Sequence, residues 1–209
     1  MKKLLGFTLS ELLMAVVVIG IIIAITIPVI VDTAPSAEKA LIQRSYFTVT
    51  NTVRDMINNP YMYQVMDSAT GVRYVGFDDT NSISFLGRTY SGNTKFIDLF
   101  INQLNIKGSV DTTSSNCNFE SCSSCKTVTT SNGMKWSFGV PTNISTGDFI
   151  AYILIDVNGD GSPNCYQGGG CGSEYDQYRI SVYKDGGILL NSADVWAREV
   201  ISARTKLVE

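Results

Sequence analysis

The sequence predicts an α+β fold, with a long N-terminal helix (half transmembrane, half packed on a sheet) and an antiparallel sheet of about four strands. Three observations support this prediction. Residues 12–31 form an uncharged apolar run, a helical apolar stripe follows it, and the second half of the chain holds short apolar segments separated by turn residues. The helical pattern therefore precedes the strand pattern instead of alternating with it.

The uncharged run extends over twenty residues and is interrupted only by Gly20, Thr26 and Pro28. As a helix, twenty residues extend for about 30 Å, which matches the hydrocarbon core of a bilayer. Lys2 and Lys3 precede the run and favour a cytoplasmic N-terminus. We therefore predict a single-pass membrane helix.

Two simpler interpretations of this start are a cleaved secretory signal peptide and a plain membrane anchor. A signal peptide ends at a small-residue cleavage site, and residues 34–37 are the only stretch that resembles one. An anchor explains the length of the run but not Glu11, which lies at its edge. A charge at that position is costly and usually functional.

The following segment repeats apolar residues with the period of a helix. The stripe consists of Ile42, Tyr46, Val49, Val53, Met56 and Ile57. The sequence 58–60, Asn-Asn-Pro, ends the pattern. Residues 7–58 are therefore predicted to form one helix about 78 Å long, apolar all round over 7–31 and amphipathic over 36–58.

The clearest strand signal is a hairpin with arms at 127–130 and 134–138, because Asn132-Gly133 between them suits a type I′ turn. Residues 149–155 and 177–183 are two further strands, and a turn at 185–187 leads into 188–190. The remaining predicted elements are strands at 72–77 and 83–86, helices at 94–105 and 192–207, and a surface loop at 109–126.

Composition excludes several classes of function. The chain has a net charge of −3, and nucleic-acid binding needs clustered Lys and Arg, so nucleic acid is not expected as the main partner. The chain contains no histidine, which excludes Ser-His-Asp triads, Cys-His dyads and His-ligated zinc. We therefore predict that the protein is not an enzyme.

All five cysteines lie beyond residue 116, in the part predicted to lie outside the cytoplasm, where disulfides form. Cys165 and Cys171 flank a glycine-rich loop and are the pair predicted first. Cys117, Cys122 and Cys125 then leave one thiol over, and the sequence does not say which. A zinc knuckle that uses Cys122 and Cys125 is the alternative, although the ligand spacing disfavours it.

A segment with oxygen side chains directly follows the strand at 149–155. Asp156, Asn158 and Asp160 precede Gly161 as in the first half of an EF-hand loop, and Ser162 and Asn164 add further oxygen atoms. Calcium takes six to eight such ligands. These five residues are the predicted calcium ligands, and the alternative is a turn rich in Asp, Asn and Gly that binds no ion.

The departure from an EF-hand is at the twelfth position, where Gln167 replaces the bidentate glutamate. Glu174 or Asp176 is a candidate to complete the shell. Calcium is the only cofactor predicted.

The residues Gly6-Phe7-Thr8-Leu9-Ser10-Glu11-Leu12-Leu13 resemble the processing motif of type IV prepilins. The resemblance covers residues 1 to about 58 and includes the spacing of Gly6, Phe7, Glu11 and the apolar run. It implies that a prepilin peptidase cuts after Gly6 and methylates Phe7. Some members of the family carry calcium loops similar to the one described above.

The resemblance also implies a domain organisation and a role for particular residues. Residues 1–6 would be a leader, 7–58 the helix with its membrane and filament core at 7–31, and 59–209 a head of αβ-loop and antiparallel sheet. Glu11 and Phe7 would contact each other between copies, and Gly20 and Pro28 would bound a segment that loses helicity in the fibre. A simple kink in the membrane helix is the alternative for Gly20 and Pro28.

The predicted function is a structural subunit, a pilin or pilin-like protein, that assembles with copies of itself or sibling pilins into a type IV pilus-like filament. The expected location is the bacterial inner membrane before assembly, and a periplasmic or cell-surface filament afterwards. The alternatives are a pseudopilin of a type II secretion or DNA-uptake system and a minor adhesive or binding subunit at the fibre tip.

Overall fold

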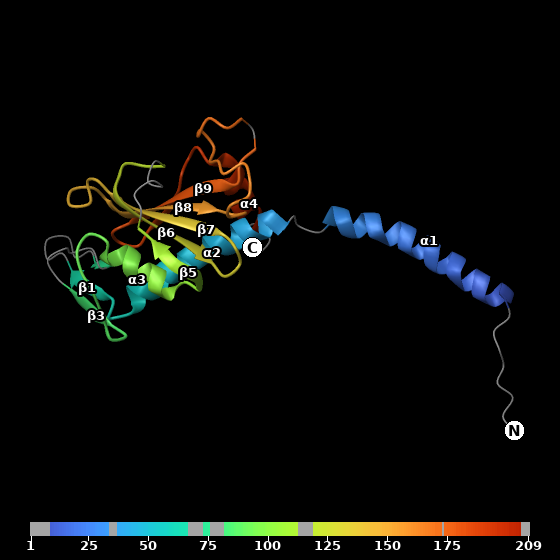
Figure 1. Cartoon of the computed structure of the whole chain (residues 1–209), viewed down its shortest axis with the longest axis horizontal. Helices are drawn as coiled ribbons and strands as arrows, with labels where there is room; N and C mark the ends of the chain where they lie inside the picture. The colour runs from blue at the N-terminus through green and yellow to red at the C-terminus, as the bar shows by residue number, and fades with distance from the viewer. Residues whose placement is uncertain are drawn as a thin grey trace, which may run out of the picture. The chain divides into compact units, whose positions relative to one another are not determined.

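The computed structural model describes residues 9–33, 37–66, 73–75, 82–112, 119–172 and 174–205. The chain divides into two compact units, Met1–Ala37 and Glu38–Glu209. Figure 1 colours the elements in chain order. The two units are described separately below.

The first unit contains one helix, α1 (Leu9–Thr33), with Glu11 in its first turn. Apolar side chains are exposed all along its first half, from Leu9 at 83% to Ile23 at 48%. In the part of the chain that the structure describes, no helix is both long and apolar enough to cross a membrane. The membrane span over 12–31 therefore stays a prediction.

The second unit begins with α2 (Ala37–Asn58), which is amphipathic as predicted. Ile42, Val49, Val53 and Met56 of the predicted stripe are buried. The single helix predicted over 7–58 is not shown, because α1 ends at Thr33 and α2 begins at Ala37, with 34–36 outside the described residues. Pro35 offers a physical reason, since proline lacks a backbone donor and disfavours helical geometry in the residue before it.

The main sheet has six antiparallel strands, where the sequence predicted about four. Its strands are β5 (Ile106–Asp111), β6 (Cys122–Thr130), β7 (Lys135–Pro141), β8 (Phe149–Asp156), β9 (Gln177–Tyr183) and β10 (Ile188–Leu190). They lie in the order β10-β9-β8-β7-β6-β5, so that each strand pairs with its neighbour along the chain. The two edge strands, β5 and β10, account for the difference.

The prediction of a surface loop over 109–126 was wrong at both ends, because β5 runs to Asp111 and β6 begins at Cys122. Strand β5 was missed because its sequence does not alternate and contains Gly108, which has a φ of +84°. The predicted hairpin is confirmed as β6 and β7, with Gly133 at a φ of +89° in the turn.

Two small hairpins and two helices complete the second unit. The hairpins are β1 (Tyr63–Met66) with β2 (Arg73–Val75), and β3 (Ile83–Phe85) with β4 (Arg88–Tyr90). Helix α3 (Lys95–Gln103) and helix α4 (Val195–Thr205) lie within the ranges predicted for them.

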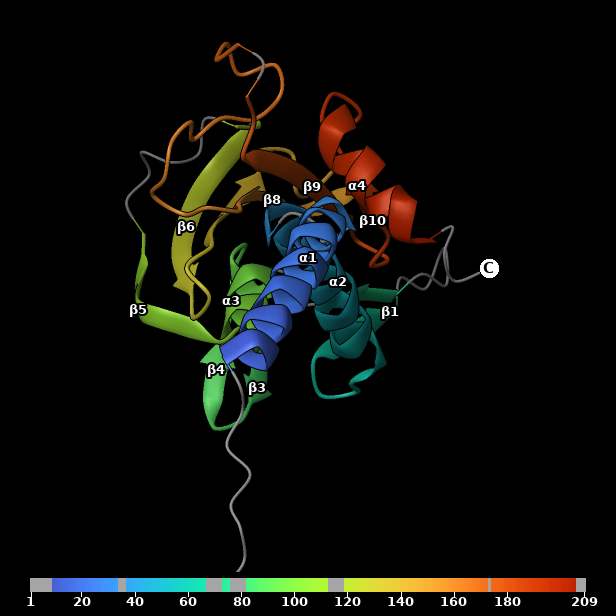
Figure 2. The same cartoon turned by 90° about the vertical axis from the view of Figure 1, so that its right-hand side faces the viewer.

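Helices α2 and α3 pack on the same face of the main sheet, which curves around them in Figure 2. On α3, the ring of Phe100 lies 6.4 Å from Trp136 and 5.4 Å from Phe138 of β7. On α2, Ser45 Oγ lies 2.7 Å from the hydroxyl of Tyr178 on β9, and both side chains are fully buried. Since Trp136 and Tyr178 are in register across the sheet through Ile155, they share one face.

The opposite face of the sheet contains a close approach between Gly139 of β7 and Cys122 of β6. A Cβ atom added at Gly139 would overlap Cys122 Sγ and lie 3.0 Å from Cys122 Cβ. The absence of a side chain at Gly139 therefore makes room for the cysteine side chain.

Replacing Gly139 with alanine is expected to destabilise the second unit, because the added methyl group overlaps Cys122 Sγ. Overpacking of this kind lowers the free energy of unfolding by about 1–3 kcal/mol, which chemical denaturation would measure. The C122A/G139A double variant should recover most of this loss, since the overlapping sulfur is gone. Additive effects of the two substitutions would contradict this account.

Candidate functional site

The loop between β8 and β9 holds the predicted calcium residues and the predicted disulfide. The disulfide Cys165–Cys171 is confirmed, with its Cα atoms 6.2 Å apart. Cys165 is buried at 2% exposure, and the carbonyl oxygen of this residue accepts hydrogen bonds from the backbone N–H groups of Asp176 and Gln177. These hydrogen bonds connect Cys165, the first residue of the disulfide-closed segment, to Gln177, the first residue of β9.

The carboxylate of Asp176 binds two backbone N–H groups of the loop. Its Oδ2 accepts a hydrogen bond from the Asn164 backbone at 2.8 Å, and its Oδ1 accepts one from the Cys165 backbone at 2.7 Å. Asp176 is 2% exposed, so these two charge-assisted bonds compensate for its burial. The residue is therefore a structural anchor of the loop.

Asp156, the first predicted calcium ligand, is also buried. Its Oδ2 accepts a hydrogen bond from Gln177 Nε2 at 2.7 Å, whereas its Oδ1 has no hydrogen-bond partner among the described residues. The pKa of this carboxyl group is raised to about 6, chiefly by burial and also by the negative charge of Asp176, while the Gln177 hydrogen bond opposes the shift. A buried oxygen without a partner is a suitable ligand for a cation.

The other predicted calcium ligands point in different directions. Asp160 is exposed, and its Oδ1 lies 3.0 Å from Lys135 Nζ. Asn158 donates a hydrogen bond from Nδ2 to the Ser162 carbonyl oxygen at 3.1 Å. Asn164 uses its backbone to bind Asp176.

Across the described residues, no group of three or more Cys, Asp or Glu side chains is placed to hold a metal ion. Only two of the five predicted ligands, Asp156 and Asp160, are carboxylates, so the calcium site stays a prediction.

A cavity of about 560 Å³ lies beside the β3–β4 hairpin, and a second cavity, which we call the acidic cavity, lies between the loop and the first turns of α2. The acidic cavity has a volume of about 530 Å³ and is lined by Glu38, Leu41, Val157, Asn158, Ser162, Pro163, Glu174, Tyr175 and Asp176. Three of these lining residues are carboxylates and none is basic. The cavity thus combines an apolar wall with negative charge.

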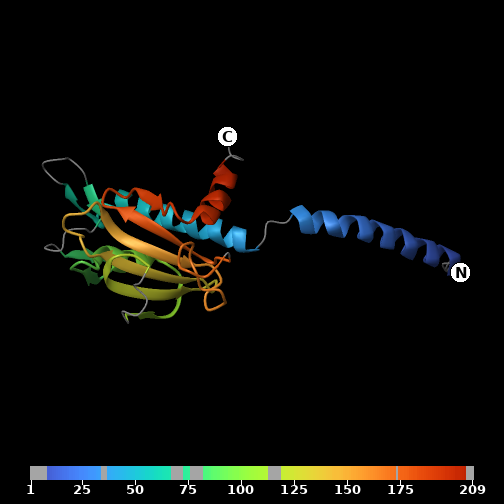
Figure 3. The same cartoon turned by 90° about the horizontal axis from the view of Figure 1, so that it is seen from above.

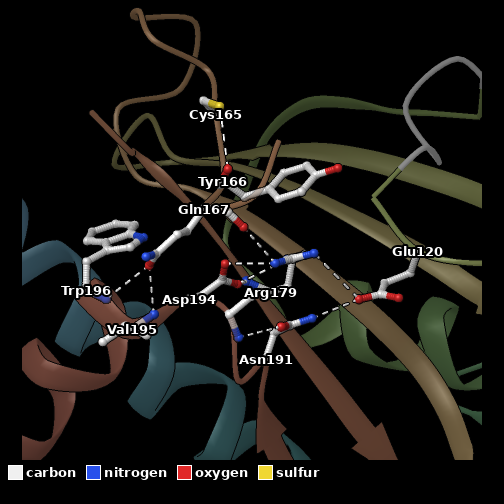
Figure 4. Close-up of polar contacts among 10 residues, drawn as sticks. Glu120, Cys165, Tyr166, Gln167, Arg179, Asn191, Asp194, Val195 and Trp196 are labelled. Atoms are coloured by element: carbon white, nitrogen blue, oxygen red, sulfur yellow. Dashed lines mark hydrogen bonds and ion pairs between the residues drawn. The ribbon is translucent and has the colours of Figure 1, made fainter. Parts of the chain in front are cut away.

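A buried ion-pair cluster lies on the other side of the loop and is drawn in Figure 4. We call it the Arg179 cluster; it consists of Glu120, Tyr166, Gln167, Arg179, Asn191 and Asp194. Arg179 donates hydrogen bonds to Asp194 from its backbone at 2.7 Å, from Nε at 3.1 Å and from Nη2 at 3.0 Å. The Asp194 side chain is fully buried, and that of Arg179 is 12% exposed.

The remaining contacts of Arg179 reach two further segments. Its Nη2 donates to the Gln167 carbonyl oxygen at 3.0 Å, and its guanidinium carbon lies 4.3 Å from the centroid of the Tyr166 ring. Its Nη1 lies 3.9 Å from Glu120 Oε1, which also accepts a hydrogen bond from Asn191 at 3.0 Å. The Arg179 guanidinium therefore connects β9 to the disulfide loop and to Glu120, which lies just before β6.

Gln167 connects the same loop to α4. Its Oε1 accepts hydrogen bonds from the backbone N–H of Val195 at 2.9 Å and of Trp196 at 3.5 Å, the first residues of the helix. These N–H groups have no partner within the helix, so Gln167 serves as a cap from outside it. Helix α4 in turn accepts a hydrogen bond from Gln43 of α2 on the Val200 carbonyl oxygen at 2.9 Å.

The charged side chains of the Arg179 cluster pair with one another, so we assign the cluster a structural role. Asp194 and Glu120 both face the guanidinium. The cluster fixes the loop, and with it the outer wall of the acidic cavity, relative to the sheet.

The sequence left open which of the three remaining cysteines is the unpaired thiol. Cys125 is disulfide-bonded, Cys117 lies outside the described residues, and Cys122 is the free thiol. Burial raises the pKa of Cys122 to about 12, and the negative charge of Glu120 adds to the shift. A thiol with this pKa stays protonated and is a poor nucleophile at neutral pH.

The predicted processing and assembly residues belong to the first unit. Gly6 and Phe7 lie outside the described residues, whereas Glu11 lies in the first turn of α1. Gly20 lies within α1, and a Cβ atom there would meet nothing within 4 Å. Pro28 also lies within α1, and its side chain is outside the described set.

No known protein family model, curated protein or solved structure matches the chain. The fold and the loop define an α+β protein with a six-stranded antiparallel sheet, a disulfide-closed loop and a buried ion-pair cluster.

The sequence did not single out the residues of the Arg179 cluster. One weak signal was present, since Arg179 occupies a polar position in an alternating strand; Asp194 lay inside the helix predicted over 192–207, whereas the structure places it directly before α4. That signal does not indicate that Arg179 and Asp194 bind each other.

Replacing Gln167 with alanine is expected to loosen the first turn of α4 because it removes the external cap. The loss of a cap lowers the free energy of unfolding by about 1 kcal/mol. Hydrogen exchange at the Val195 and Trp196 amides should become faster while that of the β9 amides stays unchanged. The control is Q103A, on the last turn of α3, and equal effects of the two variants at α4 would contradict the role of Gln167.

Calcium is expected to raise the Tm of the full chain and a chelator to lower it, because a ligand bound only by the native state stabilises that state. D156N should remove the response, since Asp156 supplies the buried oxygen without a partner. D160N is the matched control and should keep the response, because Asp160 faces Lys135. A Tm that neither calcium nor chelator changes would leave the loop as an ion-free turn.

Proposed function

We propose that the protein is a structural subunit of the pilin type, processed after Gly6 and assembled through α1 into a type IV pilus-like filament. The supporting sequence feature is the motif that contains Gly6, Phe7 and Glu11 ahead of an uncharged run. The supporting structural feature is a separate helical unit that precedes a unit with a core of its own.

The observation that carries this proposal is the apolar surface of α1. Eleven large hydrophobic side chains between Leu9 and Ile23 are 48–83% exposed. Burying apolar area is worth about 25 cal/mol per Å², so packing such helices against one another provides a large driving force for assembly. Monomeric soluble proteins rarely expose contiguous apolar patches of this kind.

Glu11 gives this packing a preferred register. A carboxylate among packed apolar helices loses hydration and is stabilised only by a cation. In the assembled fibre, the amine of Phe7 on a neighbouring copy would supply that cation after cleavage. A subunit before assembly would lie in the inner membrane with 12–31 in the bilayer.

A pseudopilin of a type II secretion or DNA-uptake system is the second candidate. The partnerless buried oxygen of Asp156 supports it, because calcium loops occur in some members of that group. Long surface fibres would favour the pilus, and co-purification with secretion-channel proteins would favour the pseudopilus.

The test is the mass of the N-terminal peptide together with electron microscopy of what the protein forms. The exported chain should begin with methylated Phe7, and the unaltered protein should form filaments. E11A should be processed normally but assemble much less, whereas D55A, which removes an exposed carboxylate from α2, should assemble as the unaltered chain does. An exported chain that retains residues 1–6, or one that stays monomeric, would reject the proposal.

A further inference from the structure

The turn of the β3–β4 hairpin contains an apolar residue in an unfavourable position. Leu86 has a φ of +50° and is 77% exposed, and Gly87 follows with a φ of +76°. Such turns favour Asn, Asp or Gly at both positions, and a bulky residue at positive φ is a real outlier. Leu86 therefore adds strain and buries little within its own unit.

Arg88 places a positive charge beside this leucine. Its side chain is exposed, and its Nη1 donates a 3.3 Å hydrogen bond to Asn102 Oδ1. Arg88 lines the cavity beside the hairpin together with Asn102. The hairpin tip, residues 86–88, therefore carries an exposed apolar residue and an exposed basic residue two positions apart. Backbone strain that the fold does not need is a reason to look for a contact outside it.

The acidic cavity has the complementary character. Leu41, Val157 and Pro163 supply apolar wall, while Glu38 and Glu174 supply carboxylates that form no ion pair with any other described residue. An apolar side chain with an adjacent guanidinium fits a cavity of this composition, because Arg binds carboxylates in bidentate geometry.

The tip and the cavity lie at opposite ends of the second unit. Figures 1 and 3 show the β3–β4 hairpin near the C-terminal end of α2, and the loop of the cavity near the N-terminal end of α2. A tip cannot reach the cavity of its own unit across a helix of 22 residues, which is about 33 Å long. Two different patches that bind each other between copies form a head-to-tail contact, which generates a ring if the rotation between copies closes and an open filament if it does not.

We propose that the hairpin tip of one copy, with Leu86 and Arg88, occupies the acidic cavity of a second copy. Leu86 packs against the apolar wall, and Arg88 pairs with Glu38 and Glu174. The proposal rests on the proposed function, because it assigns the contact between successive heads in the fibre.

The contact is tested by zero-length crosslinking of the full chain in detergent. A carbodiimide joins an amine to a carboxylate in contact with loss of water, so R88K makes position 88 reactive without changing its charge. Mixed ¹⁴N- and ¹⁵N-labelled chains should give a mixed-isotope crosslink from position 88 to Glu38 or Glu174, identified by mass spectrometry. Crosslinks found only within one copy, or only to other carboxylates, would overturn the proposal.

Two further variants separate the contact from folding. L86N should keep or raise the Tm, because asparagine suits the turn, and on the R88K background it should lower the crosslink yield. R88E should weaken association of unassembled chains in detergent by more than about tenfold through like-charge repulsion. K107E makes the same charge change on the edge strand β5 and should leave association unchanged.

The outcomes distinguish the contact from the proposed function. Filaments of processed chains without the expected crosslink would reject the head-to-tail contact alone. The expected crosslink without processing or filaments would keep the contact and reject the pilin-type function.

Discussion

The burial of Arg179 between Asp194, Tyr166 and Gln167 is the interaction on which the arrangement of the second unit depends. Removing one partner of a buried ion pair leaves an uncompensated charge and is strongly destabilising. The same guanidinium connects a central part of the sheet, the disulfide loop and the start of α4. Arg179 therefore acts together with Asp176 and the Cys165–Cys171 disulfide to hold the loop that forms one wall of the acidic cavity.

Elements with strong local signals were predicted correctly from the sequence. The Asn132-Gly133 turn specified the β6–β7 hairpin, and the apolar period specified the buried face of α2. The edge strand β5 could not be predicted in this way, because its sequence does not alternate between apolar and polar residues. The strand forms through its pairing with β6. One helix was predicted over 7–58 because apolar periodicity alone does not show where one helix ends and the next begins.

The loop shows why a site is harder to predict than a fold. The disulfide was found because two cysteines flank glycines, and that signal is local. The five oxygen side chains were grouped because they alternate along the chain, yet Asp160 turns to Lys135 and Asn158 to Ser162. Their directions are set by these partners and by Asp176, twelve residues after Asn164, whose carboxylate accepts the Asn164 backbone N–H.

The irregularity of β5 also bears on how copies of the protein meet. A regular edge strand offers a row of unpaired backbone donors and acceptors to any passing chain, which leads to uncontrolled strand addition. In β5, the pairing register with β6 shifts between Lys107 and Asp111, around Gly108. This bulged border is a poor template for another strand, so strand addition at the β5 edge is disfavoured.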